Sequence, residues 1–466
     1  MRKSRRLSLL FILLLVAILG SSCAKRRLDQ LEANRVKKLN ENIDSRLVTE
    51  TFYPDKIVDF SLEDYLKWYK NLKAPANLQL PAYENPKNLK KTEMVNDFEY
   101  LFRELKENYP FFEVLKRKYD IDFLKNHDIY LKKVRECESD EEFIQTLSEI
   151  MKDLNNYHAR IADKDYVKST LAYYSKNWNQ PSIYYEFLNL NRQVVRNRYQ
   201  LDGVQSQNSS YRLERKQADV LKKSDKSNLT FESQDDLAII KIKQMVDQKG
   251  YEEEEKILDE FLKNKHMYKA LVIDIRSNAG GNMEYWRNFL LPKLITSQKQ
   301  VTNHMFFKDS EKTRLLLADD TLNAEKLSNV DITGISLDHA EDLRDFAYYI
   351  KDVVNINPDE SDKNNGYQGK IYLLVDKDVF SAAEGFASFM KNTGTATIIG
   401  SQTGGDGITL GVINSVLPNS GLVFTYTNAL GYGPDGKINE EFPTTPDINS
   451  KSYRESLDII KDNIDK

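Results

Sequence analysis

The sequence predicts an α/β core preceded by a mainly helical region. Two short β-rich runs, 237–242 and 270–275, flank an acidic stretch whose apolar residues recur at helical spacing. This order is typical of a βαβ unit with a right-handed crossover. A third β-rich run, 371–375, also leads into a helical pattern. Because residues 91–163 carry apolar residues at helical spacing, we expect a helical domain there, followed by an α/β core over 237–450.

The helical domain contains two clear stripes of apolar residues. The first comprises Met94, Val95, Phe98, Leu101, Phe102 and Leu105, and Tyr109-Pro110 ends it. The second comprises Phe143, Ile144, Leu147, Ile150, Met151 and Leu154. Ser139 and Glu142 form a capping box at its start. It stops at Asn155-Asn156, so that Tyr157 and His158 directly follow a well-packed helix.

The remaining segments show weaker patterns. We expect a charged tether and linker over 23–90, where prolines interrupt any helix between 73 and 91. Residues 164–236 are polar, rich in tyrosine and asparagine, and are expected to form an insertion without an evident peptide-capturing module. Residues 451–466 are expected to form a C-terminal helix or tail.

The amino terminus has the pattern of an export signal. Four basic residues precede an apolar run of 11 residues, Leu9 to Leu19, which ends in Gly20-Ser21-Ser22-Cys23. A transmembrane helix needs about 20 apolar residues, so a retained anchor is the weaker interpretation. The segment resembles a bacterial lipoprotein signal. That resemblance implies removal of residues 1–22, lipidation of Cys23, and a protein anchored to the extracytoplasmic face of a membrane.

Composition excludes several functional classes. Cys137 is the only other cysteine, so neither a disulfide framework nor a thiolate metal cluster is expected. Loss of residues 1–22 removes four positive charges and changes the formal net charge from −4 to −8. A mildly acidic chain has no general attraction for nucleic acid. No signature of a metal, nucleotide or flavin site is present, so no cofactor is expected.

Ser381 is a candidate nucleophile because it lies at the turn between the β-rich run 371–375 and a helical pattern. A serine there is ordinarily only a helix N-cap. The free N–H groups of a helix start can, however, also stabilise an oxyanion. A serine nucleophile needs a base, and the chain has five histidines. His158 is held by a packed helix, and His304 is the alternative base.

Residues 271–281 form a second junction of interest, in which a buried apolar strand runs into Asn278-Ala279-Gly280-Gly281. Two glycines permit a turn whose backbone amides point outward. Asp274 and Arg276 are expected to tie this loop down by an ion pair, with a contact to substrate as the alternative.

Three groups of residues together resemble the C-terminal processing and tricorn-type serine peptidases. They are Asp274 to Gly281, then Ser381-Ala382-Ala383-Glu384 with Ile399 to Gly405, then Phe442-Pro443-Thr444-Thr445-Pro446-Asp447. Their order and spacing match the family over about 235–450. The resemblance implies a spiral α/β core related to the ClpP and crotonase folds, and an extended polypeptide as substrate.

The same resemblance identifies the general base. One branch of the family uses a lysine 25 residues after the serine, but Asp406 occupies that position here. The tricorn-like branch uses a histidine before the core, and Leu154-Asn155-Asn156-Tyr157-His158 resembles its context. That branch also has a glutamate shortly before the final Pro-Asp, which corresponds to Glu440. The resemblance therefore implies that Ser381 is the nucleophile, His158 the base and Glu440 the orienting carboxylate.

The expected reaction is acyl transfer from a peptide carbonyl to Ser381. The amides of Ala382 and of Gly281, or of Gly280, are expected to hold the oxyanion. The alternative function is that of a noncatalytic lipoprotein that binds peptides or hydrophobic ligands on the same scaffold.

Overall fold

The computed structural model describes residues 51–80, 82–86, 88–201, 227–248, 251–359 and 366–464. The expected signal peptide and Cys23 lie outside these residues. Within the described ranges, no helix is long and apolar enough to cross a membrane. The short parallel strands β1 (Thr51–Phe52) and β2 (Asn77–Leu78) belong to one compact unit, and residues 53–71 and 80 onward belong to the other. The second unit carries all the features described below.

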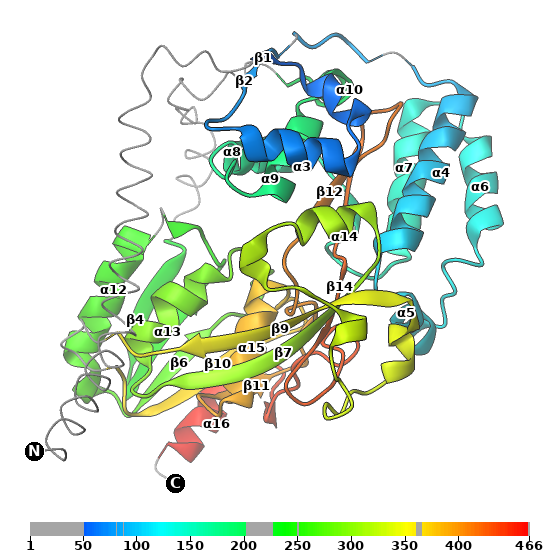
Figure 1. Cartoon of the computed structure of the whole chain (residues 1–466). Helices are drawn as coiled ribbons and strands as arrows, with labels where there is room; N and C mark the ends of the chain where they lie inside the picture. Colours follow the sequence, from blue (N-terminus) through cyan, green and yellow to red (C-terminus); the bar gives the residue numbers. More distant parts are fainter. Residues whose placement is uncertain are drawn as a thin grey trace, which may run out of the picture. The chain divides into compact units, whose positions relative to one another are not determined.

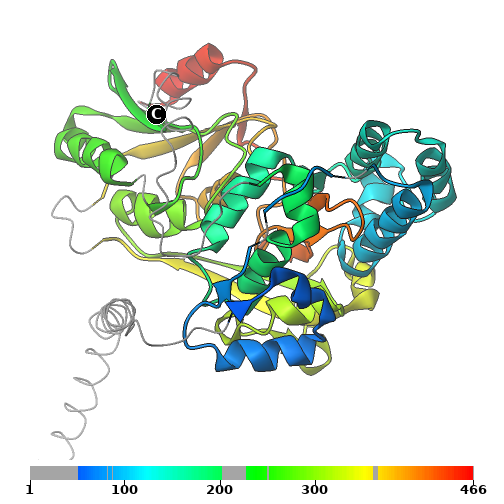
Figure 2. The ribbon, with the colours of Figure 1, turned by 90° about the horizontal axis from the view of Figure 1, so that it is seen from above.

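The N-terminal part of this unit is helical, as the sequence predicts. Its helices are η1 (Pro54–Asp59), α3 (Leu62–Asn71), α4 (Lys91–Asn108), α5 (Phe112–Tyr119), α6 (His127–Glu136) and α7 (Asp140–Lys152). Figures 1 and 2 show α4, α6 and α7 side by side. In α7 the Ser139 hydroxyl accepts a hydrogen bond from the Glu142 backbone, and Phe143, Leu147, Ile150 and Met151 are buried. The apolar stripe therefore packs this helix, and the cap fixes where it starts.

Residues 164–199, in which the sequence has no clear period, form three more helices. They are α8 (Lys164–Tyr174), α9 (Pro181–Leu190) and α10 (Gln193–Tyr199). The buried residues include polar and amphipathic side chains, such as Tyr184 and Glu186. Glu186 accepts hydrogen bonds from Tyr174 and Asn414, which satisfies its carboxylate inside the protein. Because tyrosine and glutamate replace aliphatic residues on the packed face, hydrophobic periodicity is hidden.

The α/β core is built on a six-stranded sheet in the order β15-β11-β10-β6-β5-β4. Its strands are β4 (Leu229–Gln234), β5 (Leu237–Ile242), β6 (Ala270–Asp274), β10 (Lys370–Val375), β11 (Thr397–Gly400) and β15 (Ile448–Asn449). All neighbours are parallel except β4 and β5. The predicted βαβ unit is present as β5, α12 (Tyr251–Asn264) and β6. The mixed fold of a helical region before an α/β core thus confirms the predicted class.

Helices cover both faces of this sheet (Figure 1). Side chains alternate along β6, so that Leu271 and Ile273 pack with α12 and α15 (Ala382–Asn392), whereas Val272 faces α16 (Tyr453–Asn463). Alternate burial on two sides explains why β6 reads as an unbroken apolar run. The sheet is consequently packed on both faces where β6 and β10 end, and Gly281 and Ser381 follow those ends.

Two smaller sheets complete the core. One contains β14 (Ala429–Tyr432), β7 (Lys299–Lys308), β9 (Phe346–Ile356) and β8 (Glu325–Lys326), and the other contains β12 (Ile413–Val416), β13 (Val423–Tyr426) and β3 (Arg160–Ile161). The intervening helices include η4 (Tyr285–Leu290), α13 (Leu291–Leu294), α14 (Glu311–Leu316) and η7 (Ala340–Asp345). Strand β3 pairs with β13 only two residues after His158. This pairing ties the segment that carries His158 to the core.

Candidate active site

Ser381 occupies a strained turn between β10 and α15. Its backbone has φ 56° and ψ −125°, a combination that residues with a side chain rarely adopt. Its hydroxyl makes no hydrogen bond that caps the helix, so the ordinary N-cap interpretation does not hold. The backbone is held by hydrogen bonds from the Ser381 N–H to Gly405 and from the Gly385 N–H to Ser381. The turn is thus fixed, while the hydroxyl is directed elsewhere.

That hydroxyl meets His158, whose Nε2 lies 3.0 Å from Ser381 Oγ. The His158 backbone is secured on both sides, because its N–H donates to Asn156 Oδ1 at 2.8 Å and its carbonyl accepts from Thr425 Oγ1 at 2.6 Å. The imidazole also packs on Phe380, with ring centroids 4.7 Å apart. The structure therefore places a base within hydrogen-bonding distance of the candidate nucleophile.

The second ring nitrogen of His158 contacts Asp406. His158 Nδ1 lies 2.7 Å from Asp406 Oδ2, which also accepts a hydrogen bond from Asn156 Nδ2 at 3.0 Å. The Asp406 side chain is only 1% exposed. The three side chains form the chain of contacts Ser381–His158–Asp406, the arrangement that a serine nucleophile, its base and an orienting carboxylate require.

Glu440, the carboxylate expected to orient the base, does not touch His158. It lies behind the glycine-rich loop, where a Cβ added to Gly405 would come within 2.9 Å of Glu440 Oε2. Burial raises the pKa of Glu440 well above its usual range, and the nearby Asp406 raises it further. The direct contact to His158 therefore comes from Asp406 rather than Glu440. Sequence reasoning missed this role, although Asp406 stood out as the acidic residue in the position of a lysine.

The backbone amides near Ser381 distinguish between the oxyanion donors suggested by the sequence. The Gly280 N–H already donates to Asn278 Oδ1 at 3.0 Å. Among the described residues, the Gly281 and Ala382 N–H groups have no hydrogen-bond acceptor. Gly281 has φ +130°, and a Cβ there would lie 2.1 Å from the Met245 carbonyl oxygen. Glycine is therefore required at 281, and the free amides are those of Gly281 and Ala382.

The Ser-Ala-Ala-Glu motif ends in Glu384, which links the helix after Ser381 to another segment of the core. Glu384 is fully buried and accepts hydrogen bonds from Asn439 Nδ2 and from the Thr444 backbone and hydroxyl. Burial raises the pKa of Glu384, and these donors oppose the shift. The helix that carries Ser381 is thereby joined to the segment 439–444.

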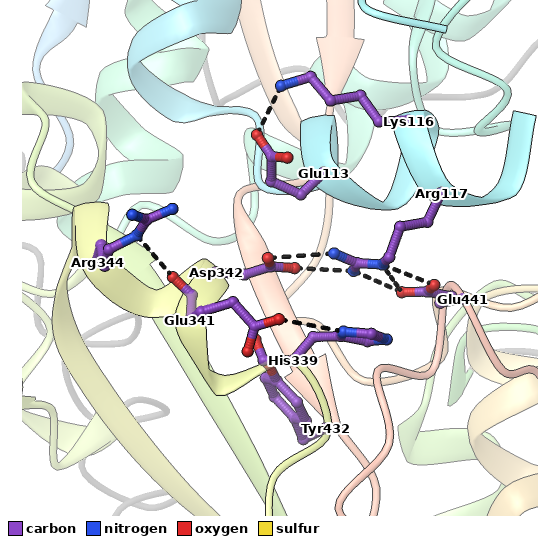
Figure 3. Close-up of polar contacts among 9 residues, drawn as sticks. All are labelled: Glu113, Lys116, Arg117, His339, Glu341, Asp342, Arg344, Tyr432 and Glu441. Atoms are coloured by element: carbon purple, nitrogen blue, oxygen red, sulfur yellow. Dashed lines mark hydrogen bonds and ion pairs between the residues drawn. The ribbon is translucent and has the colours of Figure 1, made fainter. Parts of the chain in front are cut away.

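A cluster of ion pairs holds that same segment to the helical region (Figure 3). Arg117 of α5 donates to Glu441 through Nε and Nη2 and to Asp342 through both terminal nitrogens, at distances of 2.6 to 3.1 Å. Next to it, Lys118 Nζ donates to the Glu440 carbonyl at 2.9 Å. The side chains of Asp342 and Glu441 are nearly buried. Helix α5 therefore fixes the loop that lies behind Asp406.

Two further residues singled out in the sequence have structural contacts. Arg276 binds Asp274 in a bidentate pair, with both nitrogen to oxygen distances 2.8 Å. This is the expected ion pair within the loop. His304, the alternative base, lies inside β7, where its Nδ1 is 2.8 Å from the Tyr349 hydroxyl.

Ser381 and His158 open into a cleft of about 1010 Å³. Gly281 and the segments around 245–247 and 282–287 line one part of it, and residues of α8 line another. Across the described part of the chain, no group of three or more His, Cys, Asp or Glu side chains could hold a metal ion. The site therefore places a serine hydroxyl, an imidazole and free backbone amides together in a cleft large enough for several peptide residues.

Comparisons with known proteins identify a family and similar solved structures. Residues 236–450 match the model of peptidase family S41. No curated protein matches the chain. Among solved structures, mature CPAF in complex with lactacystin is similar, with 15% identity, TM-score 0.51, and coverage of 80% of this chain and 97% of that one.

Two other solved structures align over similar lengths of this chain. The photosystem II D1 C-terminal processing protease has 15% identity and TM-score 0.38, and the alignment covers 79% of this chain and 96% of that one. The tricorn protease has 13% identity and TM-score 0.40, with coverage of 81% and 37%.

Proposed function

Because residues 236–450 belong to peptidase family S41, we propose that this peptidase is a serine endopeptidase that cleaves extended polypeptides through an acyl-enzyme on Ser381. The observation that carries the proposal is the 3.0 Å contact between Ser381 Oγ and His158 Nε2, at a strained turn inside an open cleft. A strained residue in such a place is a mark of function.

The proposed reaction follows the contacts of the site. His158 Nε2 takes the proton of Ser381, whose oxygen attacks the carbonyl carbon of the scissile bond. The N–H groups of Gly281 and Ala382 hold the oxyanion, and Asp406 stabilises the imidazolium through Nδ1. His158 then gives the proton to the leaving amine. Water, deprotonated by His158, hydrolyses the acyl-enzyme and restores Ser381.

A direct test uses the chain without residues 1–22, assayed on casein and on a peptide library. The wild type should cleave both and should be labelled by a fluorophosphonate at Ser381. Ser381→Ala should abolish cleavage and labelling, and His158→Ala should reduce cleavage by at least about 100-fold. Peptide binding without cleavage or labelling would instead support the noncatalytic binding protein suggested as the alternative.

We further propose that the protein is exported and anchored by lipid at Cys23, with the folded part on the extracytoplasmic face. The basic residues, the apolar run of 11 residues and the cysteine at its end support this. Cells that express the full chain should incorporate a palmitate analogue into it, and Cys23→Ser should remove the label. Equal labelling of both chains would contradict the anchor.

A further inference from the structure

We propose that the cleft selects polypeptides with a lysine or arginine near the scissile bond, and that Asp247, Glu284 and Tyr173 form the subsite for that side chain. This inference rests on the proposed function, because it takes Ser381 as the attacking residue. It names a substrate class by its charge and assigns specificity to three residues outside the catalytic group.

The charges that line the cleft are predominantly negative. Among the residues that the structure describes, its acidic side chains are Asp247, Glu284, Asp319 and Asp352, and its only lysine or arginine is Arg287. That guanidinium lies 3.4 Å from Asp352, which leaves the other three carboxylates without a cationic partner among the described residues. A low-dielectric cleft with excess negative charge attracts cationic segments and repels acidic ones.

Two of the carboxylates without a cationic partner among the described residues, Asp247 and Glu284, adjoin the proposed oxyanion site. Gly281 bridges to Met245, and Asn282 Nδ2 donates to Asp247 Oδ1 at 3.0 Å. Glu284 follows Gly281 by three residues, so their Cα atoms are at most about 11 Å apart. An extended substrate advances about 3.3 Å per residue. Asp247 and Glu284 can therefore reach a side chain within about three residues of the scissile bond.

Helix α8 lines the same cleft as these carboxylates. Its cleft-lining residues are Tyr166, Ser169, Thr170, Tyr173 and Tyr174, which recur at helical spacing and all bear hydroxyl groups. Tyr173 is 45% exposed. Burial of its hydroxyl raises the pKa of Tyr173, and the charges of Asp247 and Glu284 raise it further. Tyr173 thus lines the same cleft as both carboxylates.

Such a set matches the chemistry of a long basic side chain. Two carboxylates can accept hydrogen bonds from an ammonium or guanidinium group, and the ring of Tyr173 offers a face for a cation. The hydroxyl groups along α8 can bind the polar main chain. An acidic side chain in the same place would meet the like charges of Asp247 and Glu284, whereas Arg287 is paired with Asp352.

The test compares fluorogenic peptides that differ only in lysine, norleucine or glutamate at one position, placed in turn at each of the three positions before and after the scissile bond. At the best position, we expect kcat/KM for lysine to exceed that for glutamate by about tenfold at low salt, since each partly exposed ion pair contributes a factor of roughly two to five. Raising the salt to about 1 M should reduce the ratio, because the screening length falls to about 3 Å.

The variant that removes the subsite charge is Asp247→Asn with Glu284→Gln. The ratio of lysine to glutamate should fall below about threefold in this double variant. The matched control is Glu253→Gln with Glu260→Gln, which removes the same amount of negative charge. Both glutamates are exposed on α12 and lie outside the cleft. This control should keep the wild-type ratio, which separates a local subsite from the effect of net charge.

Two results would overturn the proposal: equal rates for lysine and glutamate at every position, or a preference that the double variant retains. Binding of the same peptides to Ser381→Ala separates this proposal from the proposed function. If no peptide is cleaved and Ser381 is not labelled, the peptidase assignment is wrong. Tighter binding of lysine peptides to Ser381→Ala would still support the subsite, and equal binding would reject it.

Discussion

Replacing Asp406 by asparagine should slow catalysis strongly while leaving the fold intact. Asp406 Oδ2 accepts a hydrogen bond from His158 Nδ1 at 2.7 Å, and both side chains are largely buried. A hydrogen bond to a charged group contributes about 1.5–3 kcal/mol, and its loss from the imidazolium alone predicts a fall in kcat of roughly 10- to 150-fold. An amide can also donate to Nδ1 and hold the wrong tautomer, a change that costs about 10⁴-fold in a Ser-His-Asp triad. We therefore expect a loss of between about 10-fold and about 10⁴-fold.

The assay is kcat and kcat/KM on one fluorogenic peptide, with thermal unfolding measured in parallel. The matched variant is Glu440→Gln, which removes the neighbouring carboxylate that does not contact His158. Its kcat should fall by less than about tenfold. The opposite order of effects, a mild Asp406→Asn and a severe Glu440→Gln, would refute our reasoning and restore Glu440 as the orienting carboxylate.

Further predictions concern stability and the support of the site. Burial lowers the pKa of Lys308 to about 8, so between pH 8 and 10.5 the unfolded chain binds more protons than the folded chain. Over that window, the free energy of unfolding of the wild type should rise by up to about 3 kcal/mol relative to Lys308→Met, as measured by urea unfolding. Free energies that change in parallel with pH in the two chains would contradict this. Gly281→Ala should reduce kcat/KM by at least about 100-fold, because its Cβ would clash with the Met245 carbonyl; near wild-type activity would place the oxyanion elsewhere. Arg117→Ala should lower the free energy of unfolding by about 3–5 kcal/mol, since it strands the nearly buried Glu441 without its partner, and Arg117→Lys should recover part of that loss; equal unfolding energies in chemical denaturation would contradict this.

Glu440 should also affect how stability varies with pH. Because its folded pKa is raised, the unfolded chain loses that proton at lower pH than the native chain does. The contribution of Glu440 to stability is therefore fully present below about pH 4.5 and decreases as pH rises through the folded pKa. Denaturation curves of Glu440→Gln should lack this decrease, whereas a decrease of the same size in both chains would assign it to other groups.

The parts of the fold that the sequence predicts are those with strong local patterns. The capped stripe of α7 and the buried run of β6 each impose one periodicity over their whole length, so their class follows from burial. Helix α9 escaped prediction because Tyr184, Glu186 and Asn189 are among its buried residues, and Arg196 is buried in the short helix α10. Strand β7 contains the buried Asn303 and the half-buried His304 among apolar residues, which breaks the simple alternation of a strand.

The site shows the same division between local and long-range information. Ser381 lies at a strand-to-helix turn and His158 follows a capped helix, so both could be found from their surroundings and from the family resemblance. The contact of His158 with Asp406 joins residues 248 positions apart, and it depends on the turn of the glycine-rich loop at Asp406, φ 49°. No pattern in the sequence encodes that turn. Glu440 occupies the sequence position expected of the orienting residue, but it lies behind the glycine-rich loop and Asp406 makes the contact with His158.

The most direct test of our account is mass spectrometry of the chain after treatment with a fluorophosphonate. We predict one modified peptide, carrying the adduct on Ser381, in the wild type, and labelling at least about 100-fold slower in His158→Ala, because the hydroxyl then lacks its base. An adduct on another serine, no adduct at all, or equally fast labelling of Ser381 without His158 would contradict the assignment of the Ser381–His158 pair as nucleophile and base.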